Sequence, residues 1–222
     1  IIRRSGIYMF EIIPTILTSD IEDFSRKIES IKGICPRVQI DVVDGKFADK
    51  KTLDLEAIRD LGEIAELKID LHLMVEEPKG WISRALEIVP DRIIGHIEKM
   101  ADPWSFVNEV IESGMQVGLA IDLETPVEKV SNDIYLLTDL VLLLGVKAGT
   151  GGQEFDPRVL EKIGKIKEIL GESGKIGVDG GVNEKNIKLC QKAGADIFYV
   201  GNSFWQAEDL GKRYYELVKI IV

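Results

Sequence analysis

Hydrophobic and polar residues follow a repeating cycle along the chain. Short runs of apolar, β-branched residues alternate with longer segments whose apolar positions recur at helical spacing. The first pattern predicts buried strands and the second predicts amphipathic helices. We predict strands at residues 11–17, 37–43, 68–74, 92–97, 116–121, 140–146, 175–178 and 197–200. We predict helices at residues 20–31, 54–61, 78–88, 103–112, 125–130, 157–170, 183–193 and 207–220.

Strictly alternating strands and helices indicate an α/β protein whose parallel strands are joined by right-handed crossovers. Eight such units with no segment left over predict a closed (β/α)8 TIM barrel, with an open doubly wound sheet as the alternative. No linker or low-complexity tract interrupts the cycle, so residues 1–222 are interpreted as one domain. Met9 is expected to lie near a natural start, with residues 1–8 upstream of it.

Composition narrows the possible partners. The 38 acidic and 28 basic side chains give a formal net charge of −10, which disfavours nucleic acid and anionic membrane surfaces. An anionic substrate would need local positive potential, from helix N-termini or a few cations. The chain has only two cysteines, Cys35 and Cys190, without metal-binding spacing. We therefore expect packing roles for both, in a reduced, cytoplasmic protein.

Candidate chemistry emerges from the alternation of side chains along the predicted strands. Gln39, Asp41 and Val43 share one face of the second strand, and His72 lies on the polar face of the third. The outer face of a barrel strand packs under helices, so these polar faces should point inward. Asp41, His72 and Asp179 all lie near the carboxyl ends of their strands, where barrel active sites are built. We expect them to converge at one mouth.

A buried polar layer that only fills the barrel is the alternative interpretation. Two carboxylates and one imidazole satisfy one another poorly, which favours a functional site for this set. Taken singly, Asp70 and His96 are interpreted as structural, and Asp44 as a residue that orders the loop after its strand.

Three glycine-rich loops follow the last strands: residues 149–153, 179–181 and 201–202. Glycine lets the backbone approach a ligand closely and present its amide groups. Loops after strands seven and eight, beside a helix N-terminus, commonly bind phosphate in barrel enzymes. Tight turns without a ligand would also explain any one of these loops, but their clustering favours a phosphate site.

At these residues the chain resembles the ribulose-phosphate 3-epimerase family, from Ile12 to about Trp205. The matching stretches are residues 14–17, 41–45, 70–74, 149–153 and 178–182. The resemblance implies a barrel of the ribulose-phosphate-binding type, and an isomerase of carbohydrate metabolism. Its expected substrates are ribulose 5-phosphate and xylulose 5-phosphate, or a close ketose phosphate. Family members are commonly dimers or larger, so a homo-oligomer is expected.

The resemblance also implies residue roles. Asp41 and Asp179 would exchange the proton at C3 through an enediolate. Both, with His72, would bind one divalent metal ion (Zn, Fe, Mn or Mg). The residues implied for substrate binding are Thr15, His72, Gly149, Thr150, Gly151, Gly152, Gly180, Gly181, Gly201 and Asn202.

The chain departs from the family pattern in places. Gln39 stands where the family has a metal-binding histidine, and Val43 replaces a methionine. An amide oxygen suits harder cations better than zinc-like ions. Lys147, Ala148 and Thr150 replace the usual residues of the loop after strand six, and Asn202 replaces a serine.

Three functions are compatible with these departures. The first is a 3-epimerase with an altered metal site, to which Gln39 contributes its amide oxygen. The second is a sugar-phosphate lyase or aldolase that forms a Schiff base on Lys147. The third is a non-catalytic sugar-phosphate-binding homologue that has lost the metal.

Overall fold

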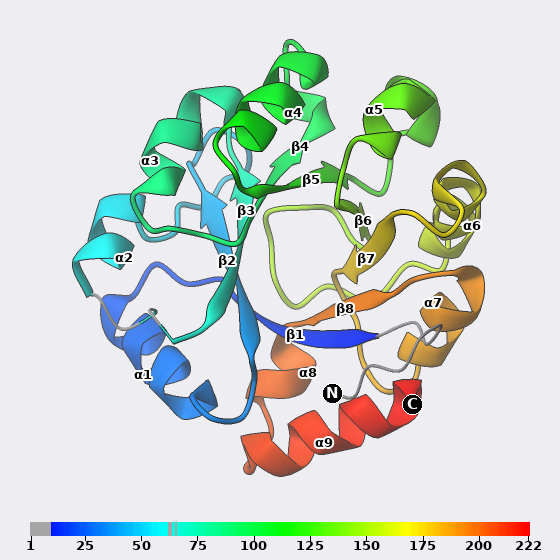
Figure 1. Cartoon of the computed structure of the whole chain (residues 1–222). Helices are drawn as coiled ribbons and strands as arrows, with labels where there is room; N and C mark the ends of the chain where they lie inside the picture. The colour runs from blue at the N-terminus through cyan, green and yellow to red at the C-terminus, as the bar shows by residue number, and fades with distance from the viewer. Residues whose placement is uncertain (1–9, 62–63, 65) are drawn as a thin grey trace.

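A computed structural model describes residues 10–61, 64 and 66–222, so residues 1–8 and Met9 lie outside the described residues. Parallel strands form a closed barrel in chain order, with β1 paired to β8 (Figure 1). The predicted TIM barrel is therefore confirmed, and the open sheet is excluded. The strands are β1 (Glu11–Ile16), β2 (Arg37–Val43), β3 (Lys68–Met74), β4 (Arg92–His96), β5 (Gln116–Ile121), β6 (Leu140–Leu144), β7 (Lys175–Asp179) and β8 (Ile197–Val200).

Helices surround the barrel on the outside (Figure 1). The α-helices are α1 (Ile21–Ile31), α2 (Leu55–Leu61), α3 (Ile82–Leu86), α4 (Pro103–Glu112), α5 (Asn132–Leu136), α6 (Val159–Leu170), α7 (Ile187–Ala193), α8 (Asn202–Trp205) and α9 (Leu210–Ile221). The 3-10 helices are η1 (Pro78–Trp81), η2 (Ile97–Lys99) and η3 (Val127–Lys129). Within the described ranges, no helix is long and apolar enough to cross a membrane.

Local sequence signals explain where several helices begin and end. The side chain of Asp20 accepts hydrogen bonds from the backbone amides of Glu22 and Asp23, which caps α1. Asp102 caps α4 in the same way, with Pro103 in the first turn. Gly171 ends α6 at a φ of 57°, a backbone conformation that glycine adopts without strain.

The predicted helix at residues 125–130 is wrong. That segment holds only the 3-10 turn η3, and the α-helix of this unit is α5. Val127 and Val130 are both buried, and their spacing of three residues imitates a helical pattern within a single turn. The short helix α8, directly after β8, was not predicted.

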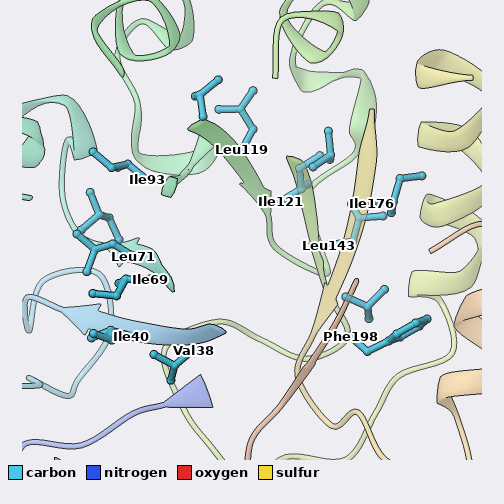
Figure 2. Close-up of a cluster of buried hydrophobic side chains, with 14 of the residues drawn as sticks. Val38, Ile40, Ile69, Leu71, Ile93, Leu119, Ile121, Leu143, Ile176 and Phe198 are labelled. Atoms are coloured by element: carbon cyan, nitrogen blue, oxygen red, sulfur yellow. The ribbon is translucent and has the colours of Figure 1, made fainter. Parts of the chain in front are cut away.

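Side-chain alternation divides the apolar residues between two cores. Outward side chains of the strands, such as Ile40, Leu71 and Leu143, pack beneath the helices (Figure 2). Inward side chains, including Val43 and Met74, form a second cluster inside the barrel. The two cysteines are buried, and burial raises the pKa of each thiol to about 12, in line with the predicted packing roles.

An ion-pair cluster surrounds Asp70, whose side chain is fully buried on β3. Its carboxylate accepts hydrogen bonds from Arg37, from Arg92 at 2.8 Å and from the Tyr199 hydroxyl at 2.7 Å. Arg37 and Arg92 are the first residues of β2 and β4, so the cluster lies toward the amino-terminal end of the barrel. The structural interpretation of Asp70 agrees with these contacts.

Candidate active site at the carboxyl ends of the strands

Asp41, His72 and Asp179 meet inside the mouth of the barrel. Asp41 and His72 are register partners on β2 and β3, and Asp179 is the last residue of β7. Nδ1 of His72 lies 3.0 Å from Oδ1 of Asp41 and 3.8 Å from Oδ2 of Asp179. One potential ligand atom from each of the three residues lies within 4.8 Å of the others. This arrangement can hold a divalent cation.

The two carboxylates influence each other electrostatically. Burial, and then the negative charge of Asp41, raise the pKa of Asp179 to about 6. The hydrogen bond from Gln39 and the proximity of His72 act in the opposite direction, but less strongly. Asp179 can therefore exchange a proton close to neutral pH, as an acid–base catalyst requires.

Gln39 is fully buried behind the two carboxylates. Its Nε2 donates hydrogen bonds to Oδ1 of Asp41 at 2.9 Å and to Oδ2 of Asp179 at 2.7 Å. Its Oε1 is buried without a hydrogen-bond partner. A half-turn of the amide would exchange these two atoms and direct an oxygen toward the carboxylates. The donor set therefore fits a divalent ion, with Gln39 able to provide an oxygen.

Sequence reasoning missed the surroundings of His72. Nε2 of His72 lies 2.9 Å from Nε2 of His96, and Nδ1 of His96 lies 3.1 Å from Oε2 of Glu98. His96, interpreted from the sequence as structural, thus contacts the site directly. The sequence did contain a signal for this contact. His96 is the last residue of β4, and His72 lies near the end of the adjacent strand β3. Burial lowers the pKa of His96 and so favours its neutral ring, while the hydrogen bond to Glu98 acts in the opposite direction.

A cavity of about 640 Å³ opens above the carboxylates. All residues implied for substrate binding line this cavity, together with Asp41 and Asp179. Gln39 does not line it, because the amide lies buried beneath. The loop after β6 lies close to the start of α8, since a Cβ added to Gly152 would lie 3.3 Å from Nδ2 of Asn202.

Gly180 and Gly181 bring the backbone unusually close to its neighbours. Both have positive φ angles, of 94° and 69°. A Cβ at Gly181 would lie 2.6 Å from the backbone nitrogen of Phe155, which leaves no space for a side chain. Only glycine accommodates this conformation and this contact, so the loop can present its backbone to a ligand.

Lysines supply positive charge at the mouth. Lys27, Lys50 and Lys147 line the cavity of this acidic protein. Lys27 pairs with Asp23 at 2.7 Å and lies 5.5 Å from the ring centroid of Trp205. Lys27, Lys50 and Trp205 could not be assigned to the site from the sequence, because nothing in helix α1 or in the loops distinguishes them from surface residues.

The position of Lys147 weakens the aldolase interpretation. Strand β6 ends at Leu144, so Lys147 lies in the following loop and not at the end of an inner strand. Its side chain is exposed. A Schiff-base lysine is usually activated by desolvation or by a neighbouring cation, and exposure removes the first of these.

Asp44 orders the loop after β2, as expected. Its Oδ1 accepts hydrogen bonds from the backbone amides of Lys46 and Phe47, both at 2.8 Å. Its Oδ2 accepts another from the amide of Glu76 at 2.8 Å. These bonds hold the carboxylate in a structural role beside the site.

Known proteins resemble this chain over almost its whole length. The model of the ribulose-phosphate 3 epimerase family matches residues 11–205. The ribulose-phosphate 3-epimerase of Bacillus subtilis (strain 168) is 31% identical over 214 residues, which cover 94% of this chain and 98% of that protein. The ribulose-phosphate 3-epimerase of Helicobacter pylori (strain J99) is 31% identical, with coverage of 90% and 92%.

Solved structures share the fold at lower identity. A mutant tryptophan synthase alpha-subunit from Pyrococcus furiosus superposes with a TM-score of 0.62 at 16% identity, covering 96% of this chain and 98% of its own. The thiamine phosphate pyrophosphorylase from the same organism gives a TM-score of 0.58 at 19% identity, with 96% coverage of each chain. These similarities support the barrel fold alone.

Proposed function

The chain belongs to the ribulose-phosphate 3 epimerase family and is thus an isomerase, and from this premise we propose that it epimerises a ketopentose phosphate at C3. The proposed reaction interconverts ribulose 5-phosphate and xylulose 5-phosphate. The observation that carries the proposal is a pair of carboxylates, buried Asp41 and half-buried Asp179, bridged by one amide nitrogen. Two acid–base groups on different strands can reach the two faces of one carbon atom.

Proton transfer follows from the chemistry of the substrate. The C3 hydrogen lies beside the C2 carbonyl, so its removal leaves an enediolate. One aspartate takes this proton as a base, and the other returns a proton to the opposite face, which inverts C3. The raised pKa of Asp179, about 6, allows this side chain to hold and release a proton near neutral pH.

The residues that would hold a divalent ion are Asp41, His72 and Asp179, with the Gln39 amide oxygen as a further donor. When bound, such an ion (Zn, Fe, Mn or Mg) supplies positive charge for the substrate oxygens as negative charge develops on them. The chain's own contribution is to fix these donors: Gln39, Asp41 and His72 are all buried on adjacent strands. Fixed polar groups of this kind stabilise developing charge without reorganisation.

The glycine loops are proposed to bind the phosphate. The backbone of Gly180, Gly181 and Gly201, with Asn202, lines the end of the cavity near the last strands. Lys27 adds a positive charge to the same cavity. The loop of residues 149–152 would cover the sugar, with Thr15 beside it. An anionic substrate is therefore attracted locally, despite the net charge of −10.

Solvent exchange tests the proposal directly. In D2O, the protein should exchange the C3 proton of ribulose 5-phosphate when supplied with Zn, Fe, Mn or Mg ions. Asp41→Asn and Asp179→Asn should each abolish this exchange. Asp139→Asn is the matched control, since Asp139 accepts a hydrogen bond from the Val117 amide away from the cavity. Absence of exchange by the wild-type protein with every ion would overturn the proposal and favour a non-catalytic binder.

A further inference from the structure

His72 has a second ring nitrogen that does not face the carboxylates. This atom, Nε2, lies 2.9 Å from Nε2 of His96. Both side chains are almost completely buried, and their rings stack with centroids 5.0 Å apart. Two ring nitrogens at this distance form a hydrogen bond only when one of them carries the proton and the other accepts it.

Glu98 sets the direction of this hydrogen bond. Its Oε2 lies 3.1 Å from Nδ1 of His96, and its Oε1 accepts a bond from the Asp122 amide at 2.9 Å. Both carboxylate oxygens of Glu98 thus face hydrogen-bond partners, and a glutamate side chain is ordinarily ionised at neutral pH. An ionised carboxylate only accepts hydrogen bonds. Nδ1 of His96 must therefore carry the proton.

The tautomer of His96 determines that of His72. A neutral imidazole has one N–H, so Nε2 of His96 is an acceptor and Nε2 of His72 must donate to it. The neutral ring of His72 then has no proton on Nδ1. That bare nitrogen lies 3.0 Å from Oδ1 of Asp41. The lone pairs of His72, Asp41 and Asp179 then face one region, where the Gln39 amide donates to the two carboxylates and all three residues could hold a cation.

We propose that His96 and Glu98 are positioning residues that fix His72 in the tautomer whose Nδ1 binds the divalent metal. The inference rests on the metal site of the proposed function and adds two residues to it. Metal-binding histidines usually donate their second N–H to a fixed acceptor, which orients the ring and raises its basicity. Here that acceptor is another histidine, oriented in turn by a carboxylate. The ring of Phe47, 4.7 Å from His96, covers this pair.

Glu98→Gln reverses the hydrogen-bond chain with little change of shape. The Asp122 amide still needs an acceptor, so the introduced carbonyl oxygen should remain there and the introduced NH2 should face His96. Nδ1 of His96 then accepts, its Nε2 carries the proton, and Nε2 of His72 becomes the acceptor. The N–H of His72 moves to Nδ1, where it blocks the metal.

Nitrogen-15 NMR of the imidazole rings shows directly which ring nitrogen carries the proton. The spectra are recorded above the pH range of histidine titration, so that both rings are neutral. The chain contains two histidines, so both rings can be assigned from a single labelled sample. In metal-free wild-type protein, we expect the proton of His72 on Nε2 and that of His96 on Nδ1. In metal-free Glu98→Gln, the proton of His72 should lie on Nδ1 and that of His96 on Nε2. Zinc affinity should fall by roughly 10- to 100-fold.

Glu98→Asp is the matched control. It keeps a carboxylate, so it should retain the wild-type tautomers and most of the zinc affinity. A wild-type His72 protonated on Nδ1, or a folded Glu98→Gln variant with unchanged tautomers and zinc affinity, would overturn the inference. If Glu98→Gln does not fold, the wild-type tautomers decide alone. If NMR shows the predicted tautomers but the protein does not exchange the C3 proton, the inference stands and only the proposed epimerase activity is contradicted.

Discussion

Gln39 donates a hydrogen bond of 2.7 Å from Nε2 to Oδ2 of Asp179, which links β2 to β7 across the barrel mouth. The same nitrogen lies 2.9 Å from Oδ1 of Asp41. A neutral amide thus contacts both carboxylates at a position where the family pattern has a histidine. Because the amide can present either nitrogen or oxygen to the site, this one side chain affects both metal choice and proton transfer.

Gln39→His should change metal preference. An imidazole nitrogen is a better ligand than an amide oxygen for zinc, whereas magnesium prefers oxygen. We expect zinc affinity to rise at least about tenfold, the lower end of what even outer partners of metal ligands contribute. Magnesium affinity should not rise. Competition with a chromogenic chelator measures both, and an unchanged zinc affinity would show that residue 39 does not reach the metal.

Stability of the metal-free protein should depend on pH through Asp179. The folded-state pKa of about 6 lies above the ordinary value of 3.8, so the charged form is disfavoured in the folded protein. The stabilising contribution is complete below about pH 4 and is lost as pH rises through 6. Asp179→Asn cannot ionise. Its unfolding free energy relative to wild type should therefore increase by roughly 2–3 kcal/mol between pH 4 and 7.

Urea unfolding at several pH values measures this difference. Asp139→Asn serves as the control, because Asp139 lies outside the cavity. Parallel pH profiles for wild type and Asp179→Asn would contradict the raised pKa. Saturating zinc should reduce the pH dependence of the wild type, since a cation stabilises the charged carboxylates.

Much of the fold was accessible from the sequence because a barrel imposes one rule on every strand. Outward residues such as Ile40 must be apolar, which identifies Asp41 and His72 as inward residues. Apolar spacing is a weaker guide to short helices. Residues 125–130 have apolar spacing typical of a helix, yet buried Val127 begins an isolated 3-10 turn and buried Val130 follows it in an extended conformation.

The candidate site was only partly accessible for a different physical reason. Local periodicity places a residue on a face, but it does not state which side chains touch across strands. His96 and Lys27 could be assigned to the mouth only from their contacts in the structure, with His72 and Trp205 respectively. The half-turn choice of the Gln39 amide likewise depends on partners from β2 and β7, which no single segment contains.

Asp70→Ala should destabilise the barrel without altering the metal site. Arg37 and Arg92 are buried against this carboxylate, and its removal leaves Arg92 with neutral partners and Arg37 with only Glu11, at 3.8 Å. Breaking a buried ion pair from one side costs about 3–5 kcal/mol. Tyr199→Phe removes only one hydroxyl from the cluster and should cost about 1 kcal/mol. Urea unfolding compares the two, and equal losses would contradict the ionic role of Asp70.

Gly181→Ala should weaken binding of the phosphorylated substrate. The backbone of Gly181 has a φ of 69°, and an added Cβ would lie 2.6 Å from the backbone nitrogen of Phe155. Because Phe155 offers backbone and not a flexible side chain at this contact, the loop must shift by several tenths of an ångström or more. The amides proposed to hold the phosphate would move with it.

Gly151→Ala, in the loop after β6, is the matched control. Gly151 does not have a positive φ, and its added Cβ would meet only Leu17 at 3.5 Å, an ordinary contact. Inorganic phosphate, as a competitive inhibitor of C3 exchange, should lose at least about tenfold in affinity with Gly181→Ala, about 1.4 kcal/mol. It should change little with Gly151→Ala. Equal inhibition of both variants would place the phosphate elsewhere in the cavity, and Lys147 would then be the next residue to substitute.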